Sequence, residues 1–267
     1  MKYKMIAVDM DGTLLGSDRK ISARNARAIR SAVDRGIRFV LATGRPIQGV
    51  RDYADSLGLD GAVITYNGAV IVDLATEEIL FEQSMNKDDA ALAIKLGQEY
   101  DTTMCIWSGG QLYVNKLNDR AYDYMNISGV DPVLVEEFDT LIQRGITKVL
   151  WYDDVDMIGR MPSEMAKQPF RETSFCLSRP FFIEFFSSKA SKAAAISRLC
   201  EMHGIKPEEV ITIGDAPNDI SMIEFAGLGV AMGNAHDEVK AAAKYVTVSN
   251  DEDGVAAVIE KFVLGGI

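Results

Sequence analysis

The feature that most restricts the fold of this chain is a short apolar run that ends in two aspartates. Residues 5–8 are all apolar, and Asp9, Asp11 and Gly12 follow within the next four positions. A short apolar run bounded by turn residues predicts a strand that is buried on both faces, as in a parallel sheet covered by helices. Ligand sites in such sheets lie at the carboxyl ends of the strands. The sequence therefore predicts an α/β protein with a candidate site where its first strand ends.

Helical patterns alternate with further apolar runs after this first strand. A helix is predicted between an N-cap at Ser22 and a stop at Gly36, because apolar residues recur between them at helical spacing. Residues 37–42 form the next predicted strand, and Pro46 opens a helix that extends to the vicinity of Leu57. Two consecutive strand–helix units predict a doubly wound, mainly parallel sheet. Further strands are predicted at residues 62–65, 210–213, 228–232 and 245–248, and a last helix at residues 253–263.

The two aspartates after the first strand create an electrostatic conflict. Asp9 and Asp11 point the same way if the extended conformation continues, and their carboxylates then repel each other unless a cation or a shared proton relieves them. A hard divalent cation with oxygen ligands is the simplest relief, and Mg²⁺ suits a carboxylate site that also handles phosphate. The alternative is that the pair belongs only to a polar turn that closes the strand.

This segment resembles the first motif of the haloacid dehalogenase superfamily of phosphohydrolases. The motif reads Asp-x-Asp-x-Thr followed by apolar residues, and Asp9, Asp11 and Thr13 match it ahead of two leucines. On this resemblance we expect Asp9 to attack phosphorus and to become an aspartyl-phosphate. Asp11 would protonate the leaving alcohol and then take a proton from water, while its main-chain carbonyl and the Asp9 carboxylate hold Mg²⁺.

Thr43 stands at the end of the second predicted strand, and therefore on the same sheet edge as Asp9. Taken alone, a threonine before Gly44 is a common turn residue. In the resembled superfamily, a Ser or Thr at this place donates a hydrogen bond to the transferred phosphoryl group, and the order Thr-Gly-Arg-Pro is similar to the Cof-type branch. Arg45 either adds positive charge near the phosphate or is a solvated arginine at a helix start. Thr43, Gly44 and Arg45 are thus the predicted phosphate-binding residues of this segment.

A lysine later in the chain matches the third motif. Residues 187–193 are predicted to start a helix, and within them Lys192 follows Glu184 by the eight positions that the resembled motif has, which selects it over Lys189. The family commonly has glycine after this lysine, whereas this chain has the similarly small Ala193. A cation at a helix start opposes the helix dipole, which favours a functional role. Lys192 is expected to neutralise phosphate oxygens together with Thr43.

The fourth motif follows the strand predicted at residues 210–213. Gly214, Asp215 and Asp219 match Gly-Asp-x-x-x-Asp, and Asn218 before the last aspartate is typical of Cof-type members. The resemblance implies that Asp215 is a Mg²⁺ ligand and that Asp219 orients either a water on the ion or Lys192. The alternative for Asp219 is a helix cap. Asn218 is a predicted substrate-binding residue.

Two further asparagines lie beside predicted strand ends. Asn67 and Gly68 separate two apolar runs, which predicts a hairpin. A similar asparagine in Cof-type enzymes lies at the rim of the active site, so Asn67 has a second possible role in binding substrate. Asn234 follows the strand predicted at residues 228–232 and either touches the phosphate or metal shell or serves a turn.

The middle of the chain has a different pattern. Strand-like runs in hairpins, with helices between them, predict an α+β insertion at residues 84–187 within a catalytic core made of residues 1–83 and 188–267. This insertion looks like the type IIB cap of the Cof-type branch, which covers the active site and selects substrates. The alternative is a second domain with an unrelated binding task.

Composition excludes several classes of protein. A chain of 267 residues that is 48% hydrophobic can bury a large core, while a formal charge of −11 argues against binding to nucleic acid. The three scattered cysteines favour neither a disulfide framework nor a structural zinc site, which fits a reducing, cytoplasmic location. No apolar stretch approaches the roughly 20 residues of a membrane-spanning helix, and no signal peptide or obligatory protein partner is evident.

Together these features predict a Mg²⁺-dependent phosphatase that acts on a small phosphorylated metabolite. Sugar phosphates or other small phosphomonoesters are what the resemblance implies, and pyridoxal phosphate and flavin mononucleotide stay open. A phosphotransferase or phosphomutase would use the same intermediate on Asp9 but pass the phosphoryl group to another hydroxyl. A non-enzymatic sensor of phosphorylated ligands is the second alternative.

Overall fold

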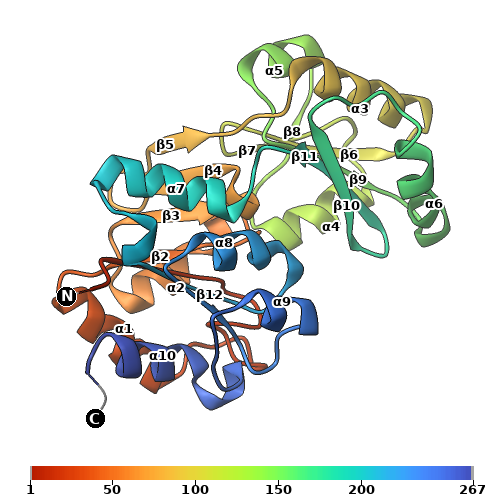
Figure 1. The fold of residues 1–267 in the computed structure, drawn as a ribbon. Helices are drawn as coiled ribbons and strands as arrows, with labels where there is room; N and C mark the ends of the chain where they lie inside the picture. Colours follow the sequence, from red (N-terminus) through yellow and green to blue (C-terminus); the bar gives the residue numbers. More distant parts are fainter. Residues whose placement is uncertain (1, 266–267) are drawn as a thin grey trace. The chain divides into compact units, whose positions relative to one another are not determined.

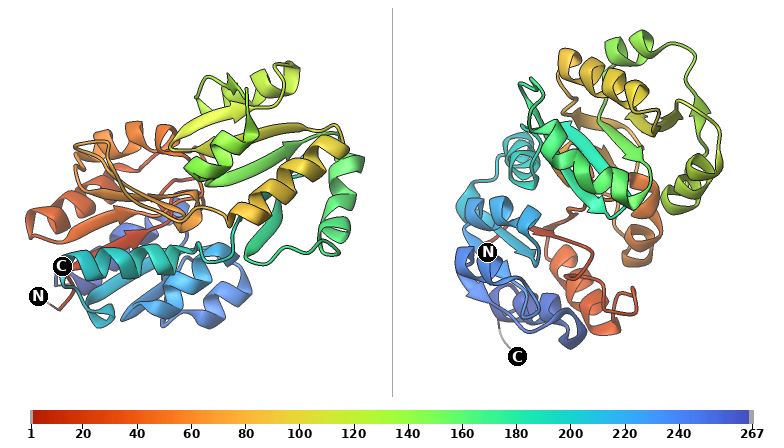
Figure 2. Two further views of the ribbon diagram at one scale, coloured as in Figure 1. Left: turned by 90° about the horizontal axis from the view of Figure 1, so that it is seen from above. Right: turned by 90° about the vertical axis from the view of Figure 1, so that its right-hand side faces the viewer.

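The computed structural model describes residues 2–265 and divides into two compact units. The first unit combines the residues up to Phe81 with those from Ser191 onward, and the second contains Glu82–Ala190. Figure 1 shows the elements coloured along the chain, and Figure 2 gives two further views of the same ribbon. The second unit is therefore inserted between two parts of the first.

A five-stranded parallel sheet forms the centre of the first unit. Its strands are β1 (Met5–Val8), β2 (Arg38–Leu41), β12 (Val210–Gly214), β13 (Leu228–Ala231) and β14 (Tyr245–Val246). Their order is β14-β13-β12-β1-β2, and each neighbouring pair runs parallel. Every residue of β1, β12 and β13 is buried, as expected of strands with helices on both faces. The predicted α/β class and parallel sheet are confirmed, although β14 is shorter than its apolar pattern predicts.

A second, three-stranded sheet lies next to β2 along the chain. Its strands are β3 (Ala62–Thr65), β4 (Val70–Asp73) and β5 (Ile79–Glu82), in that order. One parallel bridge joins Ala42, the residue after β2, to Ile64 of β3, so β3 lies beside the end of β2. The antiparallel pairing of β3 with β4 confirms the predicted hairpin. Its turn is a 3-10 turn at Tyr66–Gly68 in which all three residues have positive φ.

Helices cover both faces of the parallel sheet. They are α1 (Ala23–Asp34), α2 (Arg51–Leu57), α7 (Lys192–His203), α8 (Ile220–Phe225), α9 (Asp237–Ala242) and α10 (Gly254–Phe262). Ser22 caps α1, as predicted, because its hydroxyl accepts a hydrogen bond from the backbone N–H of Asn25. Helices α1 and α10 lie side by side in Figure 1. Ile196 of α7 and Met222 of α8 share a buried core with Met5 of β1.

Helix α7 begins later than the sequence pattern predicts. The prediction started the helix at Ser187, but the structure begins it at Lys192. Ser191 is the N-cap, and its hydroxyl accepts a hydrogen bond from the backbone N–H of Ala194. Lys192 therefore occupies the first helical position.

The second unit is built on a mixed sheet. Its elements are α3 (Lys87–Glu99), β6 (Thr103–Ser108), β7 (Gln111–Val114), α4 (Asp119–Ser128), β8 (Val133–Leu134), α5 (Phe138–Arg144), β9 (Lys148–Tyr152), α6 (Val155–Met165), β10 (Thr173–Arg179) and β11 (Phe182–Ser187). The sheet order is β10-β11-β9-β6-β7-β8. Side chains from α3, α5 and α6 share one core with Val149 of β9 and Phe185 of β11. Ile106 of β6 belongs to the same core, so the side chain of its neighbour Trp107 points to the opposite face of the sheet. There Trp107 packs against Tyr124 of α4.

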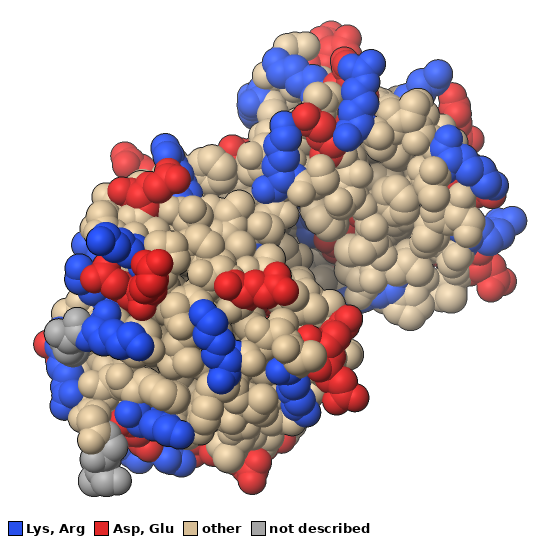
Figure 3. Space-filling view, in the orientation of Figure 1, with Lys and Arg blue, Asp and Glu red and all other residues tan. Residues whose placement is uncertain are grey.

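The surface carries charges of both signs. On the face drawn in Figure 3, lysines and arginines are interspersed with aspartates and glutamates on both units. Although the whole chain has a formal charge of −11, neither sign gathers into one large patch on this face. Among the helices of residues 2–265, none combines the length and the apolar character that crossing a membrane requires.

Candidate active site

Three neighbouring strands end in polar side chains at one edge of the parallel sheet. Asp9 follows β1, and its backbone N–H donates to Ile213, the neighbouring residue of β12, at 3.0 Å. Asp215 follows β12 directly, and Thr43 lies just beyond β2. Because the strands are parallel, their carboxyl ends coincide, and residues far apart in the sequence meet there.

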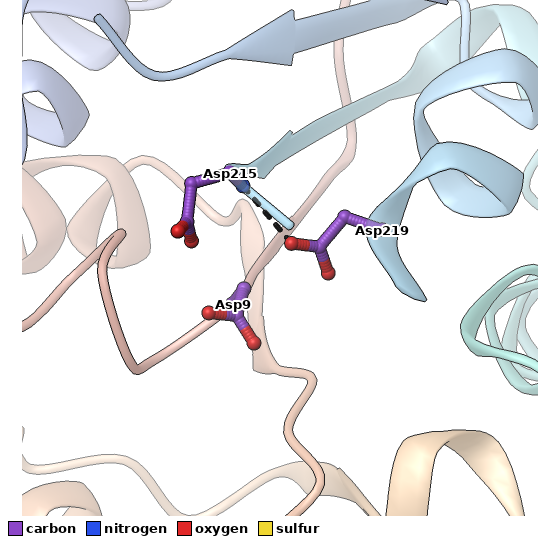
Figure 4. Close-up of side chains that lie close together, drawn as sticks. All are labelled: Asp9, Asp215 and Asp219. Carbon is purple, nitrogen blue, oxygen red and sulfur yellow. Dashed lines mark hydrogen bonds between the residues drawn. The ribbon is translucent and has the colours of Figure 1, made fainter. Parts of the chain in front are cut away.

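Three aspartates converge at this edge. A carboxylate oxygen from each of Asp9, Asp215 and Asp219 lies within 4.8 Å of the others. Figure 4 shows these carboxylates facing a common space from the ends of β1 and β12 and from the start of α8. Asp9 and Asp219 are buried, and Asp215 is half-buried. The structure thus brings together three of the four residues that the sequence assigned to a metal.

Lys192 lies against two of these carboxylates. Its Nζ is 2.5 Å from Oδ1 of Asp9 and 2.6 Å from Oδ1 of Asp219. The side chain is fully buried, although lysine is among the residues least often found in protein interiors. A buried ammonium of this kind requires carboxylate partners, and the two contacts supply them.

The electrostatics of this cluster favour a further positive charge. Burial raises the pKa of Asp9 to about 7; Lys192 opposes this rise, while Asp219 and Asp215 add to it. Burial also raises the pKa of Asp215, against the effect of a hydrogen bond from Thr13. Burial alone would lower the pKa of Lys192, but the carboxylates of Asp9 and Asp219 more than offset this effect, so the pKa of Lys192 is raised. Lys192 is therefore charged, and it neutralises only one of the three carboxylates.

Asp219 is held in place by the loop that precedes it. Its Oδ2 accepts the backbone N–H groups of Asp215 at 2.9 Å and Ala216 at 3.1 Å, while Lys192 takes its Oδ1. A Cβ at Gly214 would come within 2.5 Å of the Asp219 side chain, so the strand end has to be glycine. Both carboxylate oxygens of Asp219 thus accept hydrogen bonds, and the two from the backbone hold Asp219 in the position from which it binds Lys192.

Thr13 belongs to the site, although the sequence alone predicts no separate role for it. Its hydroxyl donates a hydrogen bond of 2.6 Å to Oδ1 of Asp215, and its side chain is fully buried. Gly12 has φ of +84°, and a Cβ there would overlap the Asp215 carboxylate. The sequence signal for this contact is the threonine of the Asp-x-Asp-x-Thr motif. It follows the end of β1, and its hydroxyl can reach a side chain at the end of the neighbouring strand β12.

Replacing Gly12 by alanine is expected to lower kcat by about 10²-fold, since the new methyl group displaces Asp215 and small displacements of a reacting group have effects of this size. The backbone penalty of a left-handed alanine adds about 1–2 kcal/mol of destabilisation. Steady-state rates and thermal unfolding of Gly12→Ala measure the two effects.

Gly36→Ala is the matched control for this variant. Gly36 has φ of +83°, but a Cβ there meets nothing within 4 Å. The Gly36→Ala variant should therefore lose about as much stability as Gly12→Ala but keep wild-type activity. Equal activity of the two variants would show that the position of Asp215 does not matter.

Asp11 is not part of the acidic cluster, contrary to the expectation that its carboxylate faces that of Asp9. The strand ends at Val8 and the chain turns directly after it, where the backbone N–H groups of Leu14 and Leu15 donate to the carbonyls of Asp9 and Met10, so the period of two does not continue. The Asp11 side chain is 57% exposed and forms an ion pair with Arg45. The conflict between the two carboxylates is thus relieved by separate cations, Lys192 for Asp9 and Arg45 for Asp11.

The remaining predicted residues of the β2 end form one connected group. The buried Thr43 accepts the backbone N–H of Arg45 at its Oγ1, at 3.2 Å, and its carbonyl accepts the N–H of Asn67 at 2.9 Å. Asn67 in turn accepts a hydrogen bond of 2.9 Å from the side-chain amide of Asn218. A Cβ at Gly44 would lie 3.0 Å from the Asn67 side chain. These five predicted residues therefore lie close together, and Asn218 directly precedes Asp219 of the acidic cluster.

Asn234 stabilises the loop of the first motif. Its Nδ2 donates to the carbonyl of Gly12 at 2.8 Å, and its Oδ1 accepts the N–H of Asn250 at 3.0 Å. Both the nitrogen and the oxygen of the Asn234 amide are therefore used in hydrogen bonds that hold the loop of the first motif.

The donor set suits a hard divalent cation. Thr13 occupies Oδ1 of Asp215, so Oδ2 of Asp215 remains for an ion. Lys192 uses one lone pair of Oδ1 of Asp9, so the second lone pair of that oxygen is available to the same ion and Oδ2 of Asp9 stays free. Carboxylate oxygens are the ligands that Mg²⁺ prefers. Asp219 fits as a neighbour of the ion's ligands rather than as a direct ligand, because both its oxygens are already bonded.

Comparisons with known proteins agree with this geometry. Residues 6–259 match the family of haloacid dehalogenase-like hydrolases. The chain is 37% identical to the putative phosphatase YxeH of Bacillus subtilis, over 98% of this chain and 99% of YxeH. It is 34% identical to the B. subtilis 5-amino-6-(5-phospho-D-ribitylamino)uracil phosphatase YcsE, over 98% of this chain and 96% of YcsE.

A solved structure shows the same fold. The HAD subclass IIB sugar phosphatase BT4131 superimposes with a TM-score of 0.77 at 25% identity, covering 97% of this chain and 98% of that one. The match includes both units, which confirms the resemblance to the Cof-type branch. The chain therefore belongs to the haloacid dehalogenase-like hydrolases, and it is a phosphatase of that superfamily.

Proposed function

We propose that this protein is a Mg²⁺-dependent phosphatase that hydrolyses small phosphomonoesters, sugar phosphates among them, through a phosphoryl group carried on Asp9. One observation carries the proposal. Three clustered carboxylates have one buried ammonium beside them, that of Lys192, which contacts two of the three. The cluster therefore has a formal charge of −2 that a divalent cation would balance. Burying these charges next to the buried Thr43 costs folding free energy. A phosphoryl-transfer reaction explains why the protein retains them, because its catalysis depends on positioned charges and hydrogen-bond donors.

In the first step, Asp9 is the nucleophile. Its free Oδ2 attacks phosphorus, the bond from phosphorus to the leaving oxygen breaks, and the carboxyl group of Asp11 gives its proton to that oxygen. Lys192 holds Asp9 at the other oxygen, Oδ1, and so fixes the direction of the attack. The products are an alcohol and an aspartyl-phosphate.

In the second step, water attacks the same phosphorus. The Asp11 carboxylate accepts the proton of that water, the acyl phosphate bond breaks, and Asp9 is restored as inorganic phosphate leaves. Thr43 is placed to donate to a phosphate oxygen, since among the described residues its hydroxyl accepts the N–H of Arg45 and donates to none. Lys192 and Thr43 thereby stabilise the charge on the equatorial oxygens.

The metal would be held by Asp9 and Asp215, with the main-chain carbonyl of Asp11 as a third oxygen ligand. When bound, Mg²⁺ supplies positive charge that offsets both the carboxylates and the phosphate. Thr13 and Asp219 keep their hydrogen bonds to the neighbouring groups and preserve the spacing of the ligands.

Substrate choice is assigned in this proposal to the second unit, Glu82–Ala190. Two relatives point to phosphorylated polyols: BT4131 is described as a sugar phosphatase, and YcsE is named for a substrate with a phosphorylated ribityl chain. The free cysteines Cys105, Cys176 and Cys200 support the proposed cytoplasmic location.

Removal of divalent cations tests the metal role. Excess EDTA is expected to stop phosphate release from a panel of sugar phosphates and p-nitrophenyl phosphate, and added Mg²⁺ should restore it. Because Mg²⁺ would bind only the folded protein, it should also stabilise the wild type, by about 2.7 kcal/mol at a concentration one hundred times its Kd.

Asp215→Asn should lose this stabilisation by Mg²⁺. Asp251→Asn should keep it, because Asp251 is an exposed residue of the 3-10 helix Asn250–Glu252 and is not a proposed ligand. Full activity in EDTA would contradict the metal role. A phosphorylated acceptor in place of inorganic phosphate would identify the reaction as transfer rather than hydrolysis.

A further inference from the structure

We propose that Arg45 is a positioning residue that directs the Asp11 carboxyl group, and not a ligand of the substrate phosphate. The inference rests on the proposed function, because it assigns Arg45 a task in the protonation of the leaving group. It replaces the sequence-based expectation that Arg45 adds charge next to the phosphate.

The contact between the two residues is bidentate. Nε of Arg45 donates to Oδ2 of Asp11 at 2.8 Å, and Nη2 donates to Oδ1 at 2.5 Å. Two parallel N–H bonds from one edge of a guanidinium fix both the position and the plane of a carboxylate. Bidentate binding of phosphate through this edge would require the same two donors, and Asp11 already occupies them.

Arg45 is itself held on its other sides. Its Nη1 donates to the carbonyl of Gly49 at 3.1 Å, and its Cζ lies 5.3 Å from the ring centroid of Tyr53. Tyr53 is tied in turn by a hydrogen bond of 3.2 Å from its hydroxyl to the carbonyl of Arg19. A fixed guanidinium is suited to orienting a partner and less suited to following a mobile phosphate.

Asp11 needs such a partner. Its side chain is 57% exposed, and within residues 2–265 its carboxylate takes its hydrogen bonds from Arg45. An exposed aspartate would otherwise sample several rotamers, most of them pointing away from a substrate. Each carboxylate oxygen has a second lone pair, so the bidentate contact leaves room for the proton that Asp11 must carry.

The chemistry predicts which substrates depend on Arg45. As the bond from phosphorus to the leaving oxygen breaks, a basic alkoxide or phenoxide needs the proton from Asp11, whereas p-nitrophenoxide is stable without it. If Arg45 acts through Asp11, its loss should matter more as the leaving group becomes more basic. If Arg45 binds phosphate, its loss should affect all leaving groups equally.

The test uses a series of substituted phenyl phosphates with Mg²⁺. In this reaction, kcat/KM reports the steps up to departure of the leaving group, so it follows protonation even if hydrolysis of the intermediate limits kcat. Arg45→Gln should lower kcat/KM by about 10²-fold for phenyl phosphate and leave it nearly unchanged for p-nitrophenyl phosphate. The inhibition constant of inorganic phosphate should stay the same.

Matched variants exclude a general loss of structure. Arg51→Gln removes the same charge from a nearby arginine that contacts Glu77 and the carbonyl of Leu74, and it should leave the whole series unchanged. Tyr53→Leu should give a smaller loss with the same dependence on leaving group, because it loosens Arg45 without removing it.

Two results would overturn the inference. One is an equal loss across the series together with weaker inhibition by phosphate, which would make Arg45 a phosphate ligand. The other is wild-type kinetics in Arg45→Gln. A wild-type enzyme that releases phosphate neither from this series nor from the panel of sugar phosphates would instead contradict the proposed function, and the two failures are therefore distinguishable.

Discussion

Asp9→Asn is expected to lower kcat by about 10⁴-fold or more, the scale seen when a catalytic nucleophile is removed. An amide has nearly the same shape as the carboxylate and can still accept a hydrogen bond from Lys192, but it cannot form an acyl phosphate. Steady-state phosphate release in saturating Mg²⁺ measures the loss.

The same variant should fold as well as the wild type. Burial and the neighbouring carboxylates of Asp219 and Asp215 raise the pKa of Asp9 to about 7, so its ionised form is disfavoured in the native state. Asp9→Asn is therefore expected to have a Tm at or above that of the wild type in Mg²⁺-free buffer. Retained turnover would remove Asp9 from the reaction, and a collapsed fold would make the kinetic result uninformative about the nucleophile.

Lys192→Met should have the second largest effect. It leaves the carboxylates of Asp9 and Asp219 buried without their cation, and breaking a buried pair costs about 3–5 kcal/mol. It also removes a donor to the phosphoryl oxygens, for which a loss of about 10²–10³-fold in kcat is typical. Chemical denaturation and steady-state kinetics measure the two losses, and Mg²⁺ should restore part of the stability because it offsets the carboxylates.

Lys189→Met is the matched control. Lys189 lies three positions earlier, is 58% exposed and pairs with Glu172 at 2.7 Å. Exposed pairs of this kind contribute about 0–1 kcal/mol, so stability and activity should be close to wild type. Comparable effects of the two substitutions would show that burial between the carboxylates gives Lys192 no special role.

Much of the core could be predicted from sequence because its elements have strong local patterns. The apolar runs before Asp9 and Asp215 became β1 and β12, and both aspartates appear at one edge because parallel strands must end together. The spacing from Glu184 selected Lys192, and the structure places that lysine, not Lys189, between the carboxylates. For these elements and residues, the local sequence pattern and the rules of parallel-sheet topology are enough to predict their positions.

Side-chain partners after the strand ends could not be predicted in the same way. The period of two stops at Val8, so the direction of Asp11 depends on the turn that begins after Asp9 rather than on strand geometry. The pairing of Asp11 with Arg45 joins two loops through a contact that no sequence pattern encodes. The start of α7 was misplaced for a related reason, because Ser191 and not Ser187 provides the cap.

The sheet of the second unit shows another limit. Its hairpin between β6 and β7 has a local pattern across Gly109 and Gly110, but the neighbours β9 and β6 are separated by a long stretch of chain. The order β10-β11-β9-β6-β7-β8 depends on which apolar faces meet, and several orders would satisfy the same alternation of residues.

The most direct test of the account is to look for the phosphoryl group on Asp9. The wild type, mixed with a ³²P-labelled sugar phosphate and Mg²⁺ and quenched in acid within one turnover, should carry label that hydroxylamine releases, and peptide mapping should place it on Asp9. Release of labelled phosphate in the same reaction with no label on the protein, or label on a residue other than Asp9, would contradict the central claim.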